Sequence, residues 1–197
     1  MSEKTYTTDL AGHCNEPTAW KILKETSGQM MERQQLIVNP SLIAIEDNGS
    51  FTLQPDTLQQ SGFDAPETSH SDRTTASAVW SMGATLFYIV MGRQVMNDKG
   101  GQSQTATSKL PYMRIDWPEL SDLVQQCLQY APAKRPSLQQ IHDKAVAQCT
   151  RCENDIKRGP KIKAVASPQH FDNTELELDF WPETMQPINQ TKKSTNP

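Results

Sequence analysis

The sequence predicts a mainly α-helical domain that carries one short β-hairpin. Four separate segments of the 197 residues repeat apolar side chains at helical spacing. One pair of short apolar runs flanks Asn48-Gly49, the residue pair best able to take positive φ at both centres of a type I′ hairpin turn. The helical period stops after Arg151. We therefore expect one folded domain over residues 9–151 and a largely disordered acidic and aromatic tail over residues 152–197.

The first expected helix covers about residues 17–33, because Pro17 suits a first helical position and apolar residues follow at helical spacing. The hairpin comes next, with its strands expected at residues 42–45 and 50–53. Residues 54–73 have no apolar period, which predicts an irregular loop.

The segment VWSMGATLFYIVMG is apolar on nearly every side, so the helix expected over residues 74–92 should lie at the centre of the domain. Gly92 is suited to end it. Residues 93–115 are polar and contain Gly100-Gly101, which favours a long mobile connection.

Two further helices are expected near the end of the domain. Pro118 opens the first, whose apolar positions are Leu120, Leu123, Val124, Cys127 and Leu128. Ser137 and Gln140 have the spacing of a capping box, which predicts the start of the last helix.

Composition excludes several classes of function. The formal net charge is -4 and the Lys and Arg residues are scattered, so a nucleic-acid partner is not expected. No apolar run approaches the roughly 18 residues of a membrane span, and the N-terminus has no signal-peptide pattern. The four Cys residues are too unevenly spaced for a disulfide framework. These features predict a cytoplasmic protein without a membrane partner.

Four motifs in order resemble the large, C-terminal lobe of protein kinases over roughly residues 15–150. They are PSLIAIEDNGSFTL, similar to the catalytic loop and its hairpin; DAPE, similar to the Ala-Pro-Glu after the activation loop; VWSMGATLFYIVMG, similar to the central helix; and LSDLVQQCLQYAPAKRPSLQQI, similar to the closing helices. The resemblance implies a kinase-like C-lobe, and the short segment ahead of Pro17 implies that no small N-terminal lobe accompanies it.

The same resemblance implies that the catalytic side chains are absent. Kinases need a Gly-rich loop, a catalytic Asp, a metal-binding Asn and the Asp of Asp-Phe-Gly. Residues 36–39 read Leu-Ile-Val-Asn where His-Arg-Asp is expected, and Leu42 occupies the place of the metal-binding Asn. Near the Asp-Phe-Gly position Asp56 is present without a following Phe-Gly, and Ala78 replaces the central-helix Asp. We expect no catalytic residue, no cofactor, no metal and no small-molecule substrate.

The resemblance also implies one structural ion pair and a type of function. It implies that Glu67 pairs with Arg135, as the Glu of Ala-Pro-Glu pairs with the Arg of the closing turn in kinases. Among kinase-like proteins the chain is most similar to the KIND family, the kinase non-catalytic C-lobe domains, which are protein-interaction modules. The resemblance implies a pseudokinase adaptor or regulator that binds another protein.

Several alternatives remain open from sequence. The pair Cys149 and Cys152 could hold a metal or be a coincidence at a helix end, and His142 lacks a catalytic partner in its motif. The chain could also be a divergent kinase or nucleotide-binding pseudokinase completed by a small lobe from another polypeptide. In the tail, Leu176, Leu178, Phe180 and Trp181 alternate with acids, so they are candidates for docking in cis or in trans, the alternative being a tail without a role.

Overall fold

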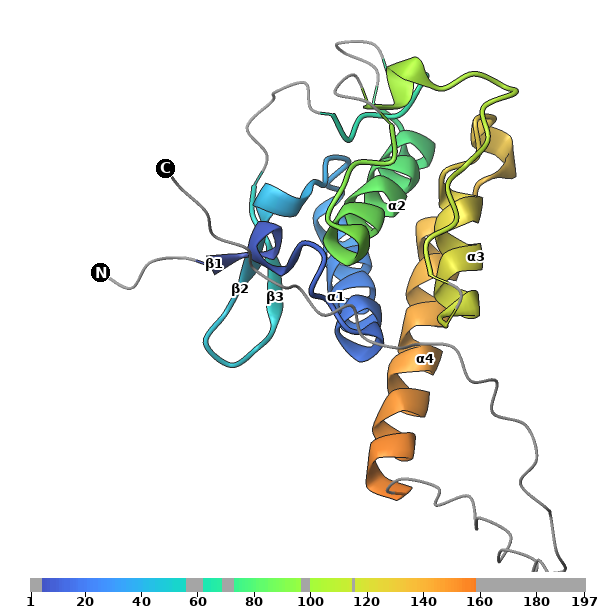
Figure 1. Cartoon of the computed structure of the whole chain (residues 1–197). Helices are drawn as coiled ribbons and strands as arrows, with labels where there is room; N and C mark the ends of the chain where they lie inside the picture. Colours follow the sequence, from blue (N-terminus) through green and yellow to red (C-terminus); the bar gives the residue numbers. More distant parts are fainter. Residues whose placement is uncertain (1–4, 56–61, 69–72, 97–99, 115, 159–197) are drawn as a thin grey trace, which may run out of the picture. The chain divides into compact units, whose positions relative to one another are not determined.

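A computed structural model describes residues 5–55, 62–68, 73–96, 100–114 and 116–158. This part of the chain is mainly α-helical, with a small antiparallel sheet of order β1-β2-β3 beside the helices (Figure 1). The helices are α1 (Glu16–Arg33), α2 (Thr75–Met91), α3 (Pro118–Cys127) and α4 (Leu138–Arg158), and the strands are β1 (Thr5–Tyr6), β2 (Ile43–Ile45) and β3 (Phe51–Leu53). The expected mainly α fold is confirmed.

The helices begin and end at capping residues. The Asn15 side chain accepts a hydrogen bond from the Thr18 N–H at 2.9 Å at the start of α1. Gly92 ends α2 with a φ of 67°, as expected from sequence. Ser137 and Gln140 form the predicted capping box ahead of α4, with the Gln140 N–H donating to Ser137 Oγ and the Ser137 N–H donating to Gln140 Oε1.

The predicted hairpin is present, but its turn differs from the expected type. Within the turn, Gly49 has a positive φ of 75°, whereas Asn48 does not have a positive φ. The Gly49 N–H donates to the Glu46 carbonyl at 2.8 Å, and the Glu46 N–H donates to the Ser50 carbonyl at 2.9 Å. A hairpin closed by Glu46 and Ser50 has a three-residue loop, in which a type I turn is followed by a left-handed glycine. The type I′ expectation was therefore wrong.

The sheet also has a strand that the sequence did not predict. In β1, Thr5 pairs with Ile45 and Tyr6 pairs with Ala44, on the edge of β2 away from β3. The next residue, Thr7, is fully buried and donates a hydrogen bond to the Pro40 carbonyl at 2.8 Å. The folded part therefore begins before residue 9, where the sequence analysis placed its boundary.

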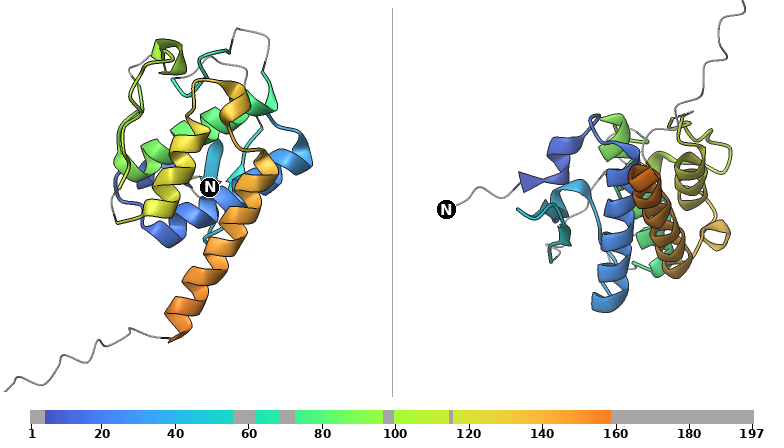
Figure 2. Two further views of the ribbon diagram at one scale, coloured as in Figure 1. Left: turned by 90° about the vertical axis from the view of Figure 1, so that its right-hand side faces the viewer. Right: turned by 90° about the horizontal axis from the view of Figure 1, so that it is seen from below.

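Helix α2 is the central element, as its sequence predicted. Trp80 and Phe87 are fully buried, and α2 packs against both α1 and α3, lying behind α3 in the left view of Figure 2. Gly83 allows α3 to come very close, because a methyl group at this position would lie 2.7 Å from Cys127 Cβ. The glycine of VWSMG is thus required by helix packing.

Part of the connection over residues 93–115 is buried against the core, where a long mobile segment was expected. Gly100 and Gly101 are buried, and a Cβ on Gly101 would lie 2.5 Å from the Asp64 carbonyl oxygen. Gln104 is 5% exposed. It accepts from Trp80 Nε1 at 2.9 Å and donates to the Leu128 carbonyl at 2.8 Å. The buried glycines and the hydrogen bonds of Gln104 therefore hold this part of the connection against the core, although other polar residues of it, such as Thr105, Thr107 and Lys109, are exposed.

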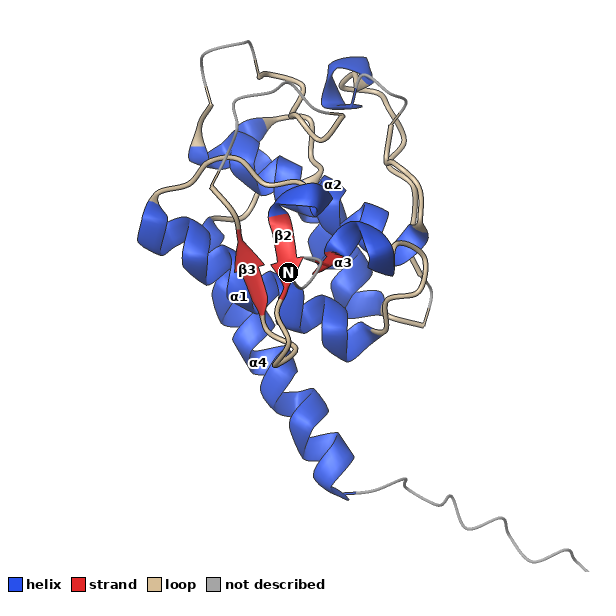
Figure 3. Ribbon diagram, turned by 90° about the vertical axis from the view of Figure 1, so that its left-hand side faces the viewer, coloured by secondary structure: helices blue, strands red, loops and turns tan. Residues whose placement is uncertain are grey.

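Helix α4 continues to Arg158, beyond the boundary expected at Arg151 (Figure 3). Its first part packs along α1, and Ile156 near its end is 73% exposed. Within the described residues, none of the helices is long and apolar enough to cross a membrane. The tail beyond Arg158, with Leu176, Leu178, Phe180 and Trp181, lies outside the described residues.

Candidate functional site

The segment between α1 and β2 is the one that the sequence resemblance aligns with a kinase catalytic loop. In the pattern His-Arg-Asp-Leu-x-x-x-Asn, an Asn position at Leu42 puts the catalytic Asp position at Ile37. Ile37 is 7% exposed and Val38 is 1% exposed, so both side chains belong to the core. The segment is held by Gln35, whose Nε2 donates to the carbonyls of Ile37 at 3.0 Å and Gln54 at 2.9 Å. The position that would accept a proton in a kinase therefore carries a buried alkyl group.

In the part of the chain that the structure describes, no group of three or more His, Cys, Asp or Glu side chains could hold a metal ion. Asp56, the carboxylate nearest the Asp-Phe-Gly position, lies outside the described residues.

Arg135 and Glu67 form a bidentate ion pair. Arg135 Nη1 and Nη2 each donate to one Glu67 oxygen, the second at 2.8 Å. The remaining donors of Arg135 bond the carbonyls of Gln129 at 2.7 Å, Ala76 at 2.9 Å and Tyr130 at 3.0 Å. Its side chain is 0% exposed, and all five N–H groups of the guanidinium have partners. One side chain thus joins the DAPE segment, the start of α2 and the turn after α3.

A second ion pair fixes the other end of the DAPE segment. Arg73 Nη1 donates to Asp64 Oδ1 at 2.9 Å, and the Asp64 side chain is 4% exposed. The Asp64 carbonyl accepts from the Gly101 N–H at 2.9 Å. Residues 64–67 are therefore anchored at both ends, by Arg73 and by Arg135.

Cys149 is buried and Cys152 is partly buried, and His142 is hydrogen-bonded to α1. Burial raises the pKa of Cys149 and of Cys152, which disfavours the thiolate needed for metal binding or nucleophilic attack. His142 Nδ1 lies 3.1 Å from both the Lys24 carbonyl and Ser27 Oγ. Because the Ser27 hydroxyl donates to the Leu23 carbonyl at 2.6 Å, His142 Nδ1 is best assigned as a donor to Lys24.

A row of side chains on α1 closes the outer edge of β3, which the sequence analysis did not anticipate. Ser50 and Gln54 bond with residues on the β2 side, so Phe51 and Leu53 turn their N–H and C=O groups to the opposite edge. All four groups are bonded by α1. Glu25 accepts from the Phe51 N–H at 2.6 Å, and Arg33 donates to the Leu53 carbonyl at 2.6 Å.

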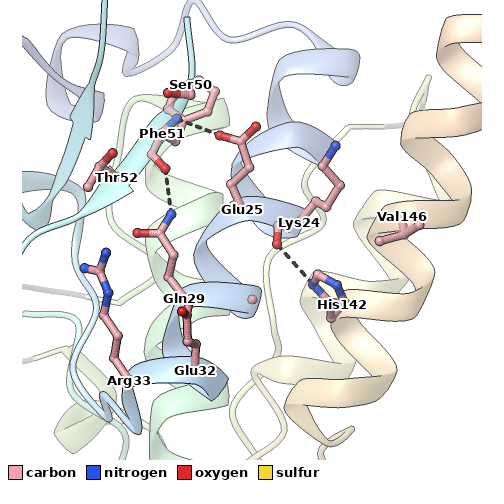
Figure 4. A pocket seen from close by; sticks show the side chains of 11 residues that line it. Lys24, Glu25, Gln29, Glu32, Arg33, Ser50, Phe51, Thr52, His142 and Val146 are labelled. Atoms are coloured by element: carbon pink, nitrogen blue, oxygen red, sulfur yellow. Dashed lines mark hydrogen bonds between the residues drawn. The ribbon is translucent and has the colours of Figure 1, made fainter.

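Gln29 supplies the two central bonds of this row. It donates to the Phe51 carbonyl at 2.8 Å (Figure 4). It also accepts from the Leu53 N–H at 2.9 Å. Lys21 extends the row by donating to the Gly49 carbonyl at 2.7 Å. We call Lys21, Glu25, Gln29 and Arg33 the edge row. Their four-residue spacing is visible in the sequence, but a polar row at this spacing is ordinarily a solvated helix face, so no signal indicated a strand beside it.

A trench lies between β3 and α4, with α1 as its floor (Figure 4). Its cavity volume is about 530 Å³. Its lining residues are Lys24, Glu25, Gly28, Gln29, Glu32, Arg33, Ser50, Phe51, Thr52, His142 and Val146. Val146 is 40% exposed, so the trench presents an aliphatic side chain to solvent.

Exposed large apolar side chains are few in the described residues and do not gather on the hairpin. They are Tyr112, Tyr130, Val146 and Ile156. None belongs to residues 34–53, the catalytic-loop segment and its hairpin. These elements therefore present no large apolar side chain that is exposed to solvent.

Comparison with known families agrees with this fold. The family model of protein tyrosine and serine/threonine kinases matches residues 42–145, more than half of the chain. The chain belongs to this family. The matched range begins at Leu42, downstream of the position of the catalytic Asp. A search of curated proteins found no matching relative.

Proposed function

We propose that this protein is a non-catalytic interaction module, a pseudokinase C-lobe that acts as a cytoplasmic adaptor or regulator. The observation that carries the proposal is a contrast between two parts of one scaffold. The Glu67–Arg135 pair is complete, whereas Ile37 and Leu42 occupy the positions of the catalytic Asp and the metal-binding Asn.

The contrast matters because phosphoryl transfer depends on positioning and charge. The catalytic Asp accepts the hydroxyl proton of the substrate, and the Asn and the Asp of Asp-Phe-Gly hold the magnesium ions. An alkyl side chain such as that of Ile37 can neither accept a proton nor bind a hard cation. Its burial among core residues favours a structural role at this position.

The finer assignment, a KIND-like domain consisting of the C-lobe alone, rests on the sequence resemblance. It implies that the module binds a segment of another protein and binds no nucleic acid, membrane or small-molecule substrate. The net charge of -4 and the scattered basic residues agree with this reading. The tail residues Leu176, Leu178, Phe180 and Trp181 are candidates for docking, because large apolar side chains among acids can fold onto a partner.

Affinity purification of the full chain, followed by mass spectrometry, tests the interaction role. Wild type is compared with a variant lacking residues 170–190 and with Leu176→Ala/Trp181→Ala. We expect a partner protein to be retained by wild type and weakened by both variants. If both variants retain the partner as well as wild type does, the tail is not the docking segment. If wild type retains no partner, the interaction role itself is refuted.

Membership of the kinase family favours one rival function. A divergent kinase or nucleotide-binding pseudokinase could take its small lobe from another chain and use Asp56 as a metal ligand. Magnesium chemistry needs at least two well-placed ligands, so the rival requires a second oxygen ligand besides Asp56. Nucleotide binding separates the two functions.

A further inference from the structure

Helix α1 presents two neighbouring rows of side chains that have different surroundings. The side chains of the edge row are hydrogen-bonded to the backbone of β3 and of the hairpin turn. The adjacent row, Lys24, Gly28 and Glu32, also has four-residue spacing and lines the trench opposite His142 and Val146 of α4. The first row completes the fold, and the second faces an open trench.

Gly28, His142 and Val146 line the middle of the trench, and we call this part of it the niche. Gly28 contributes no side chain, and a Cβ built there would lie 3.3 Å from His142 Cε1. The His142 ring is held against α1 by its hydrogen bond to the Lys24 carbonyl at 3.1 Å (Figure 4). Val146, 40% exposed, completes the niche one turn along α4. Val146 is thus the apolar side chain that the niche presents to a ligand, and a large apolar side chain can pack against it.

Two charges flank the niche. Among the described residues, the Lys24 ammonium and the Glu32 carboxylate take part in no hydrogen bond or ion pair. Eight residues separate them on α1, a rise of about 12 Å. A complementary ligand would bring an acid to one end, an apolar side chain to the middle and a base to the other end.

The hydrogen bonds of the edge row determine whether a ligand that carries this acid, apolar side chain and base binds as a strand or as a helix. An added β-strand needs free N–H and C=O groups, and those of Phe51 and Leu53 are already bonded to α1. A helix needs no backbone bonds from its partner, and its own i, i+4 and i+8 positions repeat the spacing of Lys24, Gly28 and Glu32. The same hydrogen bonds keep the trench formed before a ligand arrives, which reduces the entropy cost of binding.

We propose that the trench over Gly28 binds an amphipathic helix of a partner protein that carries an acid, a large apolar residue and a base at four-residue spacing. The inference rests on the proposed interaction function and gives it a surface and a ligand chemistry. The acid pairs with Lys24, the apolar side chain enters the niche beside Val146, and the base pairs with Glu32.

The test uses a fluorescein-labelled, alanine-based helical peptide with Glu, Leu and Lys at i, i+4 and i+8, titrated with the full chain by fluorescence anisotropy. We expect saturable binding. Lys24→Glu should weaken it about tenfold or more, and a peptide with Lys in place of its Glu should restore binding to that variant. Val146→Glu should abolish binding, whereas Ile156→Glu, a matched change on the same helix outside the trench, should leave it intact.

Absence of saturable binding, equal binding by wild type and Lys24→Glu, or equal losses in Val146→Glu and Ile156→Glu would each overturn the proposal. Both α4 positions are exposed, so thermal melts of the two variants should match that of wild type and exclude misfolding as the cause. A partner captured by the full chain and retained equally by Val146→Glu would refute the trench but leave the interaction function standing. Failure to capture any partner would instead refute the function.

Discussion

Arg135 and Glu67 lie 68 residues apart in the sequence and meet as a bidentate ion pair with the guanidinium fully covered. The pair shows that the closing turn and the segment after the activation-loop position are arranged as the kinase resemblance implies. The pair is present although Ile37 stands at the position that the resemblance assigns to the catalytic Asp.

Arg135→Ala should lower the free energy of unfolding by about 3–5 kcal/mol, because it leaves the Glu67 carboxylate and three backbone carbonyls without their donor. Urea denaturation measures the loss. Arg135→Lys retains the charge but cannot supply five donors, so it should recover only part of the stability. Arg151→Ala is the matched control, since its ion pair with Glu119 is exposed. An unfolding curve of Arg135→Ala that coincides with wild type would contradict this role.

Gln29→Ala should cost about 1–3 kcal/mol, because the Phe51 carbonyl and the Leu53 N–H both lose their partner at the edge of β3. The more specific readout is hydrogen exchange, in which the Leu53 amide should exchange faster than in wild type. Glu32→Ala, on the same helix in the neighbouring row, serves as control and should change neither quantity. Unchanged protection of Leu53 in Gln29→Ala would show that the edge row does not close the strand.

Gly83→Ala should lower the stability of the protein and Gly28→Ala should not, although both glycines lie inside helices. At Gly83 the new methyl would come 2.7 Å from Cys127 Cβ, so α2 and α3 must separate, at a cost of about 1–3 kcal/mol. At Gly28 the nearest atom belongs to the His142 side chain at 3.3 Å, which can shift by a few tenths of an ångström. Alanine also has a higher helix propensity than glycine, by up to about 1 kcal/mol. Gly28→Ala should therefore be as stable as wild type or more stable. Thermal melts of the two variants check the contrast, and equal effects would be inconsistent with the close approach of α2 and α3.

Cys127 should make the stability of the protein depend on alkaline pH. Burial raises the pKa of its thiol from 9.0 to about 12 in the folded protein. The folded state therefore keeps a proton that the unfolded state releases, so this stabilisation is fully present below pH 9 and is lost as pH rises towards 12. The slope is about 1.4 kcal/mol per pH unit.

Urea unfolding of wild type and Cys127→Ala at pH 7 and pH 10 measures the effect. Cys127→Ala should be the less stable protein at pH 7, because it loses a buried sulfur, and the difference should shrink by about 1.4 kcal/mol at pH 10. Cys14, whose pKa burial raises to about 11, is left unchanged so that it contributes equally to both proteins. Parallel pH profiles for the two proteins would contradict this assignment.

The sequence predicted the elements whose signals are local. The apolar periods located all four helices, and the Ser137–Gln140 spacing and Gly92 marked two of their ends. The hairpin was located by Asn48-Gly49, but the turn type was wrong because Asn-Gly does not determine which flanking residues close the loop. The two-residue strand β1 is too short to show any period.

What the sequence could not predict depends on contacts between distant segments. Gly100-Gly101 resembles a flexible loop, yet both residues are buried because the backbone of residues 62–66 lies directly against them. The edge row resembles a solvated face, and only the position of β3 gives it a role. The Glu67–Arg135 pair could be expected only from the resemblance to kinases, since neither residue carries a local signal for the other.

Nucleotide binding tests the central claim most directly. Isothermal titration of the full chain with ATP and magnesium, repeated with EDTA, should give no saturable heat, and neither condition should shift the thermal melt. Such a result is expected because Leu42, at the position of the metal-binding Asn, offers no oxygen ligand for magnesium. A saturable, magnesium-dependent signal that raises the melting temperature and disappears in Asp56→Ala would contradict the account and establish a working nucleotide site.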